Sequence, residues 1–302
     1  MKPDYSVRIG NILMKNPVTV ASGTFGYGSE YSRLIDVTRL GAITVKGIRK
    51  TPCAGNPTPR IAEVRGGMLN AIGLQGPGVQ GFINEHMPFL RQTGVPVIVN
   101  VWGTSLEGYV ETAAMFEGIE GIDGLELNVS CPNVKEGGAS FGTDPKRMAA
   151  VISAVRKVTS LTLITKLAPN ISDVKVFARA AADAGSDALS ISNTLPAMAI
   201  DITTRKPVLA NISGGLSGPA LHPVALKLVW DAAPVVDIPI IGMGGIMTAA
   251  DAIAFLCAGA TAVAVGTANF IDPTTPIQVI DGIAEYMLKH NFPTIASIAI
   301  PR

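Results

Sequence analysis

The chain has 302 residues, of which 48% are hydrophobic and 16% are charged, so it is long and apolar enough to bury a large core. Its 24 Lys and Arg residues against 23 Asp and Glu leave a formal net charge of +1, and no basic run carries interleaved aromatic residues, which argues against nucleic acid as a partner. The first residues lack the apolar centre of a signal peptide and no apolar run reaches the ~18 residues that span a bilayer, so we expect a cytoplasmic protein without membrane contact.

Short β-branched runs alternate with longer amphipathic stretches along the whole chain. The predicted strands are 17–22, 42–46, 96–101, 124–129, 161–167, 188–192, 238–243 and 262–266. The predicted helices lie near 29–36, 78–92, 105–118, 144–158, 173–184, 219–232, 248–258 and 274–289. Apolar strands that are each followed by a helix are typical of a (β/α)8 TIM barrel, whose strands are buried on both faces. We therefore expect residues 1–302 to form a single barrel domain.

Two connections, 47–77 and 193–218, are longer than a barrel requires. Both follow predicted strands, so they belong to the C-terminal face of the barrel, where barrel enzymes carry their chemistry. Long ordered insertions in compact domains are usually functional. We expect these two loops to cover an active site.

The chain has three cysteines, Cys53, Cys131 and Cys257, which are odd in number and far apart. A disulfide framework is therefore not expected, and a reducing compartment is the better prediction. The sequence contains no CxxC or HExxH pattern, so we expect no metal site. A lone cysteine such as Cys131 is more often a small core residue, although here it stands where a predicted strand ends, between two asparagines.

Polar side chains and glycine clusters follow most of the predicted strands. The polar residues at these ends are Lys46, Asn100, Asn128, Cys131, Lys166, Asn193 and Thr194. The last two strands end in "GMGGI" (242–246) and "GTAN" (266–269), where glycines let backbone N–H groups approach an anion and the next helix presents its N-terminus. Barrels commonly hold phosphate in the loops after strands seven and eight. The sequence therefore predicts a phosphate-bearing ligand at this mouth.

Six segments carry a resemblance to one enzyme family. They are "TVKGIRKTPCAGNPTPRIAE", "GMLNAIGLQGPG", "NVSCPNVKEGGASFG", "TKLAPN", "SNT" and "IPIIGMGGI". Together they resemble the class 1 dihydroorotate dehydrogenases, flavin enzymes of pyrimidine (UMP) biosynthesis, over nearly the whole chain. "LNAIGLQ" and "VKEGG" are most similar to the class 1B, NAD-linked catalytic subunit. Gly76 stands where the family pattern has Asn, and Ser192 where it usually has an aliphatic residue.

The resemblance implies a reaction. Cys131 would be the general base that removes the C5 proton of dihydroorotate while hydride passes from C6 to FMN, giving orotate. The glycines of 137–142 would belong to a lid that excludes water.

The resemblance also implies the ligand contacts. For the substrate they are Lys46, Asn70, Ile72, Gly73, Leu74, Asn128, Asn133, Asn193 and Thr194. For FMN they are Ser22, Lys46, Gly47, Asn100, Asn128, Lys166, Ser192, Gly218, Gly244, Gly245, Gly266 and Thr267. Asparagines suit the amide edges of a pyrimidine dione, and a lysine beside a flavin stabilises the reduced ring.

Class 1B membership further implies a partner. The sequence has no dinucleotide fingerprint and no cysteine spacing for an iron–sulfur cluster. A subunit carrying FAD and a 2Fe–2S cluster would therefore pass electrons to NAD, in a heterotetramer built on a homodimer of this chain. Two alternatives remain from the sequence alone: a class 1A enzyme that reduces fumarate, and a barrel lyase that forms a Schiff base through Lys46 or Lys166. A non-catalytic barrel is disfavoured because Cys131 and all four asparagines are present.

Overall fold

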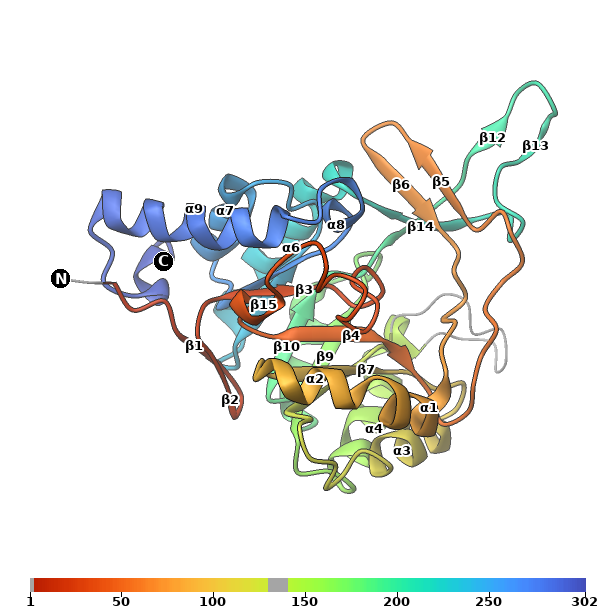
Figure 1. Ribbon diagram of the computed structural model, residues 1–302, viewed down its shortest axis with the longest axis horizontal. Helices are drawn as coiled ribbons and strands as arrows, with labels where there is room; N and C mark the ends of the chain where they lie inside the picture. The colour runs from red at the N-terminus through yellow and green to blue at the C-terminus, as the bar shows by residue number, and fades with distance from the viewer. Residues whose placement is uncertain (1–2, 130–140) are drawn as a thin grey trace.

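A parallel sheet of eight strands lies at the centre of the computed structural model, which describes residues 3–129 and 141–302 (Figure 1). Its strands are, in spatial order, β3 (Val18–Val20), β16 (Ala262–Val265), β15 (Ile240–Met243), β10 (Ala188–Ile191), β9 (Thr162–Leu167), β8 (Gly124–Leu127), β7 (Val97–Val101) and β4 (Ile43–Ile48). All residues of β7, β8, β9, β10, β15 and β16 are buried, as expected of strands covered on both faces.

The two end strands of this sheet, β3 and β4, meet through hydrogen bonds made outside a regular ladder. The Gly41 N–H donates to the Val18 carbonyl at 2.9 Å. The Thr19 hydroxyl donates to the Ala42 carbonyl at 2.8 Å. The sheet is thus a nearly closed barrel, which confirms the predicted (β/α)8 fold.

Helices surround the barrel. Those in the described residues are α1 (Gly78–Glu85), α2 (Met87–Thr93), α3 (Leu106–Ala114), α4 (Pro145–Arg156), α5 (Val174–Asp183), α6 (His222–Ala232), α7 (Ala249–Cys257), α8 (Ala268–Ile271) and α9 (Thr275–His290). Short 3-10 turns occur at η1 (Val37–Arg39), η2 (Phe141–Thr143), η3 (Pro219–Leu221), η4 (Ala233–Val235) and η5 (Ile295–Ile298). No helix in the described part of the chain is long and apolar enough to cross a membrane.

The helix predicted near 29–36 is wrong. This segment forms successive turns, and a 3-10 turn follows it only at Val37–Arg39. Ile35 is its one buried residue, so no apolar face is available to stabilise a helix against the barrel. The first barrel strand is therefore connected to the second without an α-helix.

The two long connections contain short strands outside the barrel. β5 (Ile61–Val64) and β6 (Gly67–Asn70) come from the first, and β11 (Leu195–Ala197) and β14 (Gly214–Ser217) from the second. They combine in one antiparallel sheet ordered β11-β14-β6-β5, with Gly215 opposite Asn70. A further pair, β12 (Ile200–Asp201) and β13 (Lys206–Pro207), projects beyond it (Figure 1). The insertions thus meet each other above one end of the barrel.

A hairpin closes the opposite end of the barrel. β1 (Val7–Ile9) pairs with β2 (Ile12–Met14), and the Asn11 N–H between them donates to the Thr162 hydroxyl at 3.1 Å. Thr162 begins β9, so the hairpin lies against the amino ends of the strands. The opposite, carboxyl ends remain available for a site.

We expect Gly41→Ala to destabilise the fold by about 1–3 kcal/mol, the usual cost of overpacking. A Cβ at Gly41 would lie 2.1 Å from the Asn16 carbonyl oxygen, where β3 and β4 close the barrel. Gly108→Ala is the matched control: Gly108 lies in α3, the nearest described atom outside its own helix backbone is Ser105 Oγ at 3.5 Å from the added carbon, and the variant should gain about 0.5–1 kcal/mol. Urea unfolding of both variants measures the difference, and equal stabilities would contradict this account of closure.

Candidate active site

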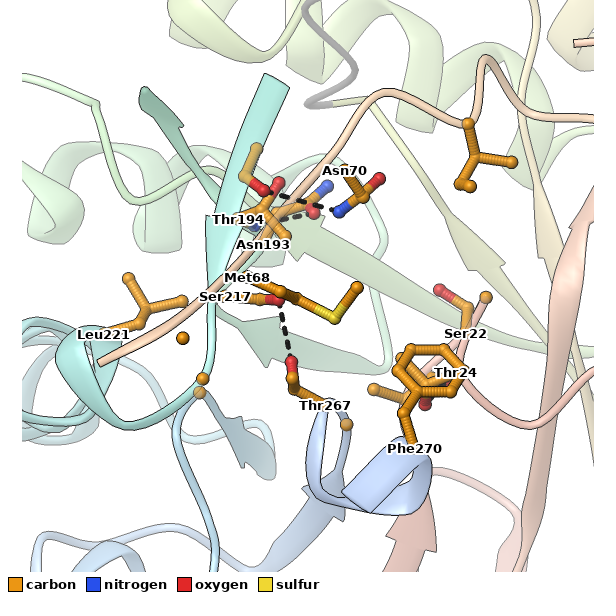
Figure 2. Close-up of a pocket in the computed structure, with 18 of the residues that line it drawn as sticks. Ser22, Thr24, Met68, Asn70, Asn193, Thr194, Ser217, Leu221, Thr267 and Phe270 are labelled. Atoms are coloured by element: carbon orange, nitrogen blue, oxygen red, sulfur yellow. Dashed lines mark hydrogen bonds between the residues drawn. The ribbon is translucent and has the colours of Figure 1, made fainter. Parts of the chain in front are cut away.

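A cavity of about 1190 Å³ opens at the carboxyl ends of the barrel strands. The barrel strands and the loops that follow them provide part of its wall, and the inserted strands β5, β6 and β14 provide another part. Figure 2 shows Asn70, Asn193 and Thr194 grouped together, with Ser217 and Thr267 joined by a hydrogen bond below them. The insertions and the barrel therefore enclose one site between them.

The amide side chains of three strand ends form a hydrogen-bonded chain. Asn193 Nδ2 donates to Asn128 Oδ1 at 3.2 Å, and Asn128 Nδ2 donates to Asn100 Oδ1 at 3.5 Å. Asn100 Nδ2 then donates to Glu126 Oε1 at 2.6 Å. At the other end, the Thr194 N–H donates to Asn193 Oδ1 at 2.8 Å. These residues offer oriented amide donors and acceptors along one wall of the cavity.

Two lysines line the cavity in different surroundings. Lys166 is 4% exposed, and its Nζ donates to Ser22 Oγ at 3.1 Å and to Glu126 Oε1 at 3.4 Å. Lys46 forms no ion pair with a described carboxylate. Burial, and secondarily the nearby Arg60 guanidinium, lower the pKa of the Lys46 ammonium. Lys46 is therefore a partly desolvated cation suited to an anionic ligand.

Glycines line the region after the seventh and eighth barrel strands. Gly244 and Gly245 have φ of +132° and +67°, conformations that other residues rarely adopt. The N–H groups of Gly244, Gly245 and Thr267 donate no hydrogen bond to any described residue. These donors beside the cavity suit a phosphate group.

The contribution of the following helix to a phosphate site, expected from the sequence, stays a prediction. At the start of α7, the Met247 and Thr248 N–H groups donate to Asp251 Oδ2 at 3.0 and 2.8 Å. The Asp251 N–H donates to Thr248 Oγ1, which completes a capping box. The Met247 and Thr248 amides just before α7 are thus already bonded, whereas the first two amides of α7 itself, those of Ala249 and Ala250, donate to no described residue.

Known proteins resemble this chain over almost its full length. The family model for dihydroorotate dehydrogenase matches residues 5–287. The chain belongs to the dihydroorotate dehydrogenase family. Three relatives are each named dihydroorotate dehydrogenase B (NAD(+)), catalytic subunit. The relative from Geobacter sp. (strain M21) is 52% identical, and the one from Geotalea daltonii is 54% identical, each over 98% of this chain and 97% of the relative. The relative from Geobacter sulfurreducens is 53% identical over 95% of this chain and 94% of the relative.

The family resemblance expected from the sequence is therefore confirmed, including its likeness to the NAD-linked form. Dihydroorotate dehydrogenases are flavin-dependent, and the term "catalytic subunit" implies a further subunit in these relatives. The open glycine donors and the nearby lysine and amide side chains fit a flavin phosphate and ring.

The structure brings together every predicted site residue that it describes. Those lining the cavity are Ser22, Lys46, Gly47, Asn70, Ile72, Gly73, Leu74, Asn100, Asn128, Lys166, Ser192, Asn193, Thr194, Gly218, Gly244, Gly245, Gly266 and Thr267. Cys131 and Asn133 lie outside the described residues, as does most of the predicted lid of 137–142. The roles assigned to all these residues stay predictions.

Some residues at the cavity escaped the sequence reasoning. Arg60, Met68, Ser217 and Phe270 also line it. Arg60 directly precedes β5, Met68 and Ser217 lie in β6 and β14, and Phe270 lies in α8, where no sequence pattern singled them out. Glu126 on β8 is only 2% exposed and accepts hydrogen bonds from Asn100 and Lys166, which line the cavity. A charged residue within an otherwise apolar buried strand was the signal that would have identified it.

We expect Lys46→Met to raise the melting temperature of the ligand-free chain at neutral pH, because it removes a partly buried charge beside Arg60. Lowering the Lys46 pKa makes the unfolded chain bind more protons than the folded chain between the folded pKa and 10.5, so stability should rise with pH there. The Met variant should lack this contribution.

Lys50→Met is the matched control, since the Lys50 side chain is 53% exposed and pairs with surface Glu111. Its melting temperature should stay close to that of the wild type across the same pH range. Parallel pH profiles for wild type and Lys46→Met would show that the Lys46 ammonium is not destabilised by the cavity.

Proposed function

We propose that this chain oxidises dihydroorotate to orotate for pyrimidine biosynthesis, with FMN and substrate in the cavity at the carboxyl end of the barrel. The observation that carries this proposal is the joint lining of one cavity by open glycine donors and by the amide and lysine side chains, in a member of the dihydroorotate dehydrogenase family. Relatives named as the NAD-linked catalytic subunit support the same reaction.

Three groups of residues would hold FMN. Gly218, Gly244, Gly245, Gly266 and Thr267 would bind its phosphate, and Ser22, Gly47, Asn100 and Ser192 would lie along the rest of it. The Lys166 ammonium would stabilise negative charge on the reduced ring. When bound, FMN supplies the acceptor for the hydride that leaves C6 of dihydroorotate.

The chain itself would orient the substrate and remove its proton. Asn70, Asn128, Asn133, Asn193 and Thr194 match the alternating donors and acceptors of a pyrimidine dione, and backbone at Ile72, Gly73 and Leu74 would frame the ring. Lys46 would attract the substrate carboxylate. Cys131 would accept the C5 proton, so that loss of the C5 and C6 hydrogens leaves the C5=C6 double bond of orotate.

A partner would remove the electrons. In the described residues no group of His, Cys, Asp and Glu side chains could hold a metal ion, and the sequence has no dinucleotide fingerprint. We infer a second subunit with FAD and a 2Fe–2S cluster that reduces NAD, joined to a homodimer of this chain. The lyase alternative is disfavoured because the chain belongs to the dihydroorotate dehydrogenase family over almost its full length.

Cys131→Ala should leave FMN bound but slow its reduction by dihydroorotate by about 10²–10⁴-fold, the usual contribution of a positioned base. Anaerobic stopped-flow absorbance measures this rate. Cys257→Ala is the matched control, because Cys257 ends α7 and does not line the cavity, so its rate should match wild type. Reduction at the wild-type rate in Cys131→Ala would exclude Cys131 as the base.

The isolated chain should be reduced by dihydroorotate yet reduce NAD negligibly, because it has no evident nicotinamide site. NAD reduction should appear when the iron–sulfur flavoprotein subunit is added, and steady-state NADH absorbance measures it. Rapid turnover of the isolated chain with fumarate would instead favour the class 1A alternative.

A further inference from the structure

Glu126 is a buried carboxylate that neither the barrel fold nor the proposed ligand contacts require. It lies on β8, opposite Asn100 of β7 and Ile164 of β9, and is 2% exposed. It does not line the cavity, but two of its partners, Asn100 and Lys166, do. Burying a carboxylate is unfavourable unless it is paired and hydrogen-bonded, and an apolar residue commonly serves a core at least as well. Its contacts therefore indicate what it does.

Both oxygens of Glu126 accept hydrogen bonds. Oε1 accepts from Asn100 Nδ2 at 2.6 Å and from Lys166 Nζ at 3.4 Å. Oε2 accepts from the Ser190 hydroxyl at 2.7 Å. An ionised carboxylate accepts only, so the amide nitrogen of Asn100 must face Glu126 and the Asn100 oxygen must face away.

The orientation of the Asn100 amide determines the orientations of the next two amide groups along the wall of the cavity. The Asn100 oxygen can only accept, so Asn128 presents its nitrogen to it, and the Asn128 oxygen then accepts from Asn193 Nδ2. The amide groups therefore all point in one sense, which the Glu126 carboxylate fixes at one end and the Thr194 N–H, donating to Asn193 Oδ1, fixes at the other. The orientation of the Asn128 and Asn193 amide groups is thereby fixed.

The same carboxylate acts on the charge of Lys166. An ammonium has three N–H donors, and Lys166 directs two of them to Ser22 and Glu126. A negative charge at this distance in a buried setting offsets part of the positive charge that Lys166 presents to the cavity.

We propose that Glu126 is a positioning residue of this site. It fixes the Asn100 end of the Asn100–Asn128–Asn193 amide chain, whose other end the Thr194 N–H fixes, and it moderates the charge of Lys166 toward the flavin. The proposal rests on the proposed function, since it assigns Glu126 to the support of the FMN and dihydroorotate contacts.

The decisive variant is Glu126→Gln, which keeps the size of the side chain but removes its charge and adds an N–H₂ donor. Its amide no longer enforces the orientation of Asn100 at this end of the amide chain, so orotate should bind the oxidised holoenzyme about tenfold more weakly. The Lys166 charge is no longer offset, so reduced FMN should bind about tenfold more tightly relative to oxidised FMN. That ratio corresponds to a rise of about 30 mV in the two-electron potential. Orotate titration followed by flavin absorbance, and equilibration with a reference dye, measure the two effects.

Glu126→Asp keeps the negative charge but shortens the side chain by one methylene, which moves the carboxylate away from Asn100 and Lys166. Orotate affinity and the relative binding of reduced FMN should therefore change in the same directions as in Glu126→Gln, but by only about two- to threefold. Thr44→Val is the matched control: Thr44 is 3% exposed, its hydroxyl lies 3.3 Å from that of Thr19, and it does not line the cavity. This variant should leave orotate affinity and flavin potential unchanged.

Unchanged orotate affinity and potential in Glu126→Gln would overturn the proposal, as would equal shifts in Thr44→Val. If Glu126→Gln does not fold, Glu126→Asp decides, and wild-type values in that variant would overturn the proposal as well. A wild-type chain that holds no flavin would instead defeat the proposed function, so the two failures are distinguishable.

Discussion

The parallel direction of the eight barrel strands is the constraint on which the site depends. It brings the carboxyl ends of strands that are far apart in sequence to one end of the barrel, where Asn100, Asn128, Lys166 and Asn193 lie within reach of each other. The β1–β2 hairpin lies against the opposite ends. The two long insertions pair with each other above the open end through Asn70 and Gly215, and so enclose a cavity instead of an exposed surface.

The two lysines at this cavity carry charges that are partly or wholly buried, which lowers the stability of the folded chain but places cations where a ligand can bind. Lys46 has a lowered pKa because it is partly desolvated near Arg60, and Lys166 is buried against Glu126. Neither arrangement favours the folded chain as well as apolar packing would. Both leave cations beside a space that suits a phosphate, a carboxylate and an electron-rich ring, which is consistent with destabilised groups gathering at functional sites.

The sequence was informative where physical patterns are strong. Strands buried on both faces appear as apolar runs, and these located all the barrel strands. A helix was expected over residues 29–36, but this segment buries only Ile35. It therefore lacks the apolar contacts with the barrel that would stabilise a helix there. The antiparallel sheet was not predicted because strands such as β6 and β14 are short and glycine-rich. Polar residues at the strand ends, such as Asn128 and Lys166, followed from the strand pattern, and the rest of the site set came from the family resemblance. The supporting role proposed for Glu126 required the hydrogen bonds of the folded chain.

The central claim is that this chain binds a flavin and reduces it with dihydroorotate. The most direct measurement is the anaerobic absorbance spectrum of the purified chain before and after dihydroorotate is added. The account predicts the spectrum of a bound oxidised flavin, identified as FMN after release, and loss of its visible bands on adding dihydroorotate. A colourless chain that takes up no FMN, or a flavin spectrum that dihydroorotate leaves unchanged, would contradict it.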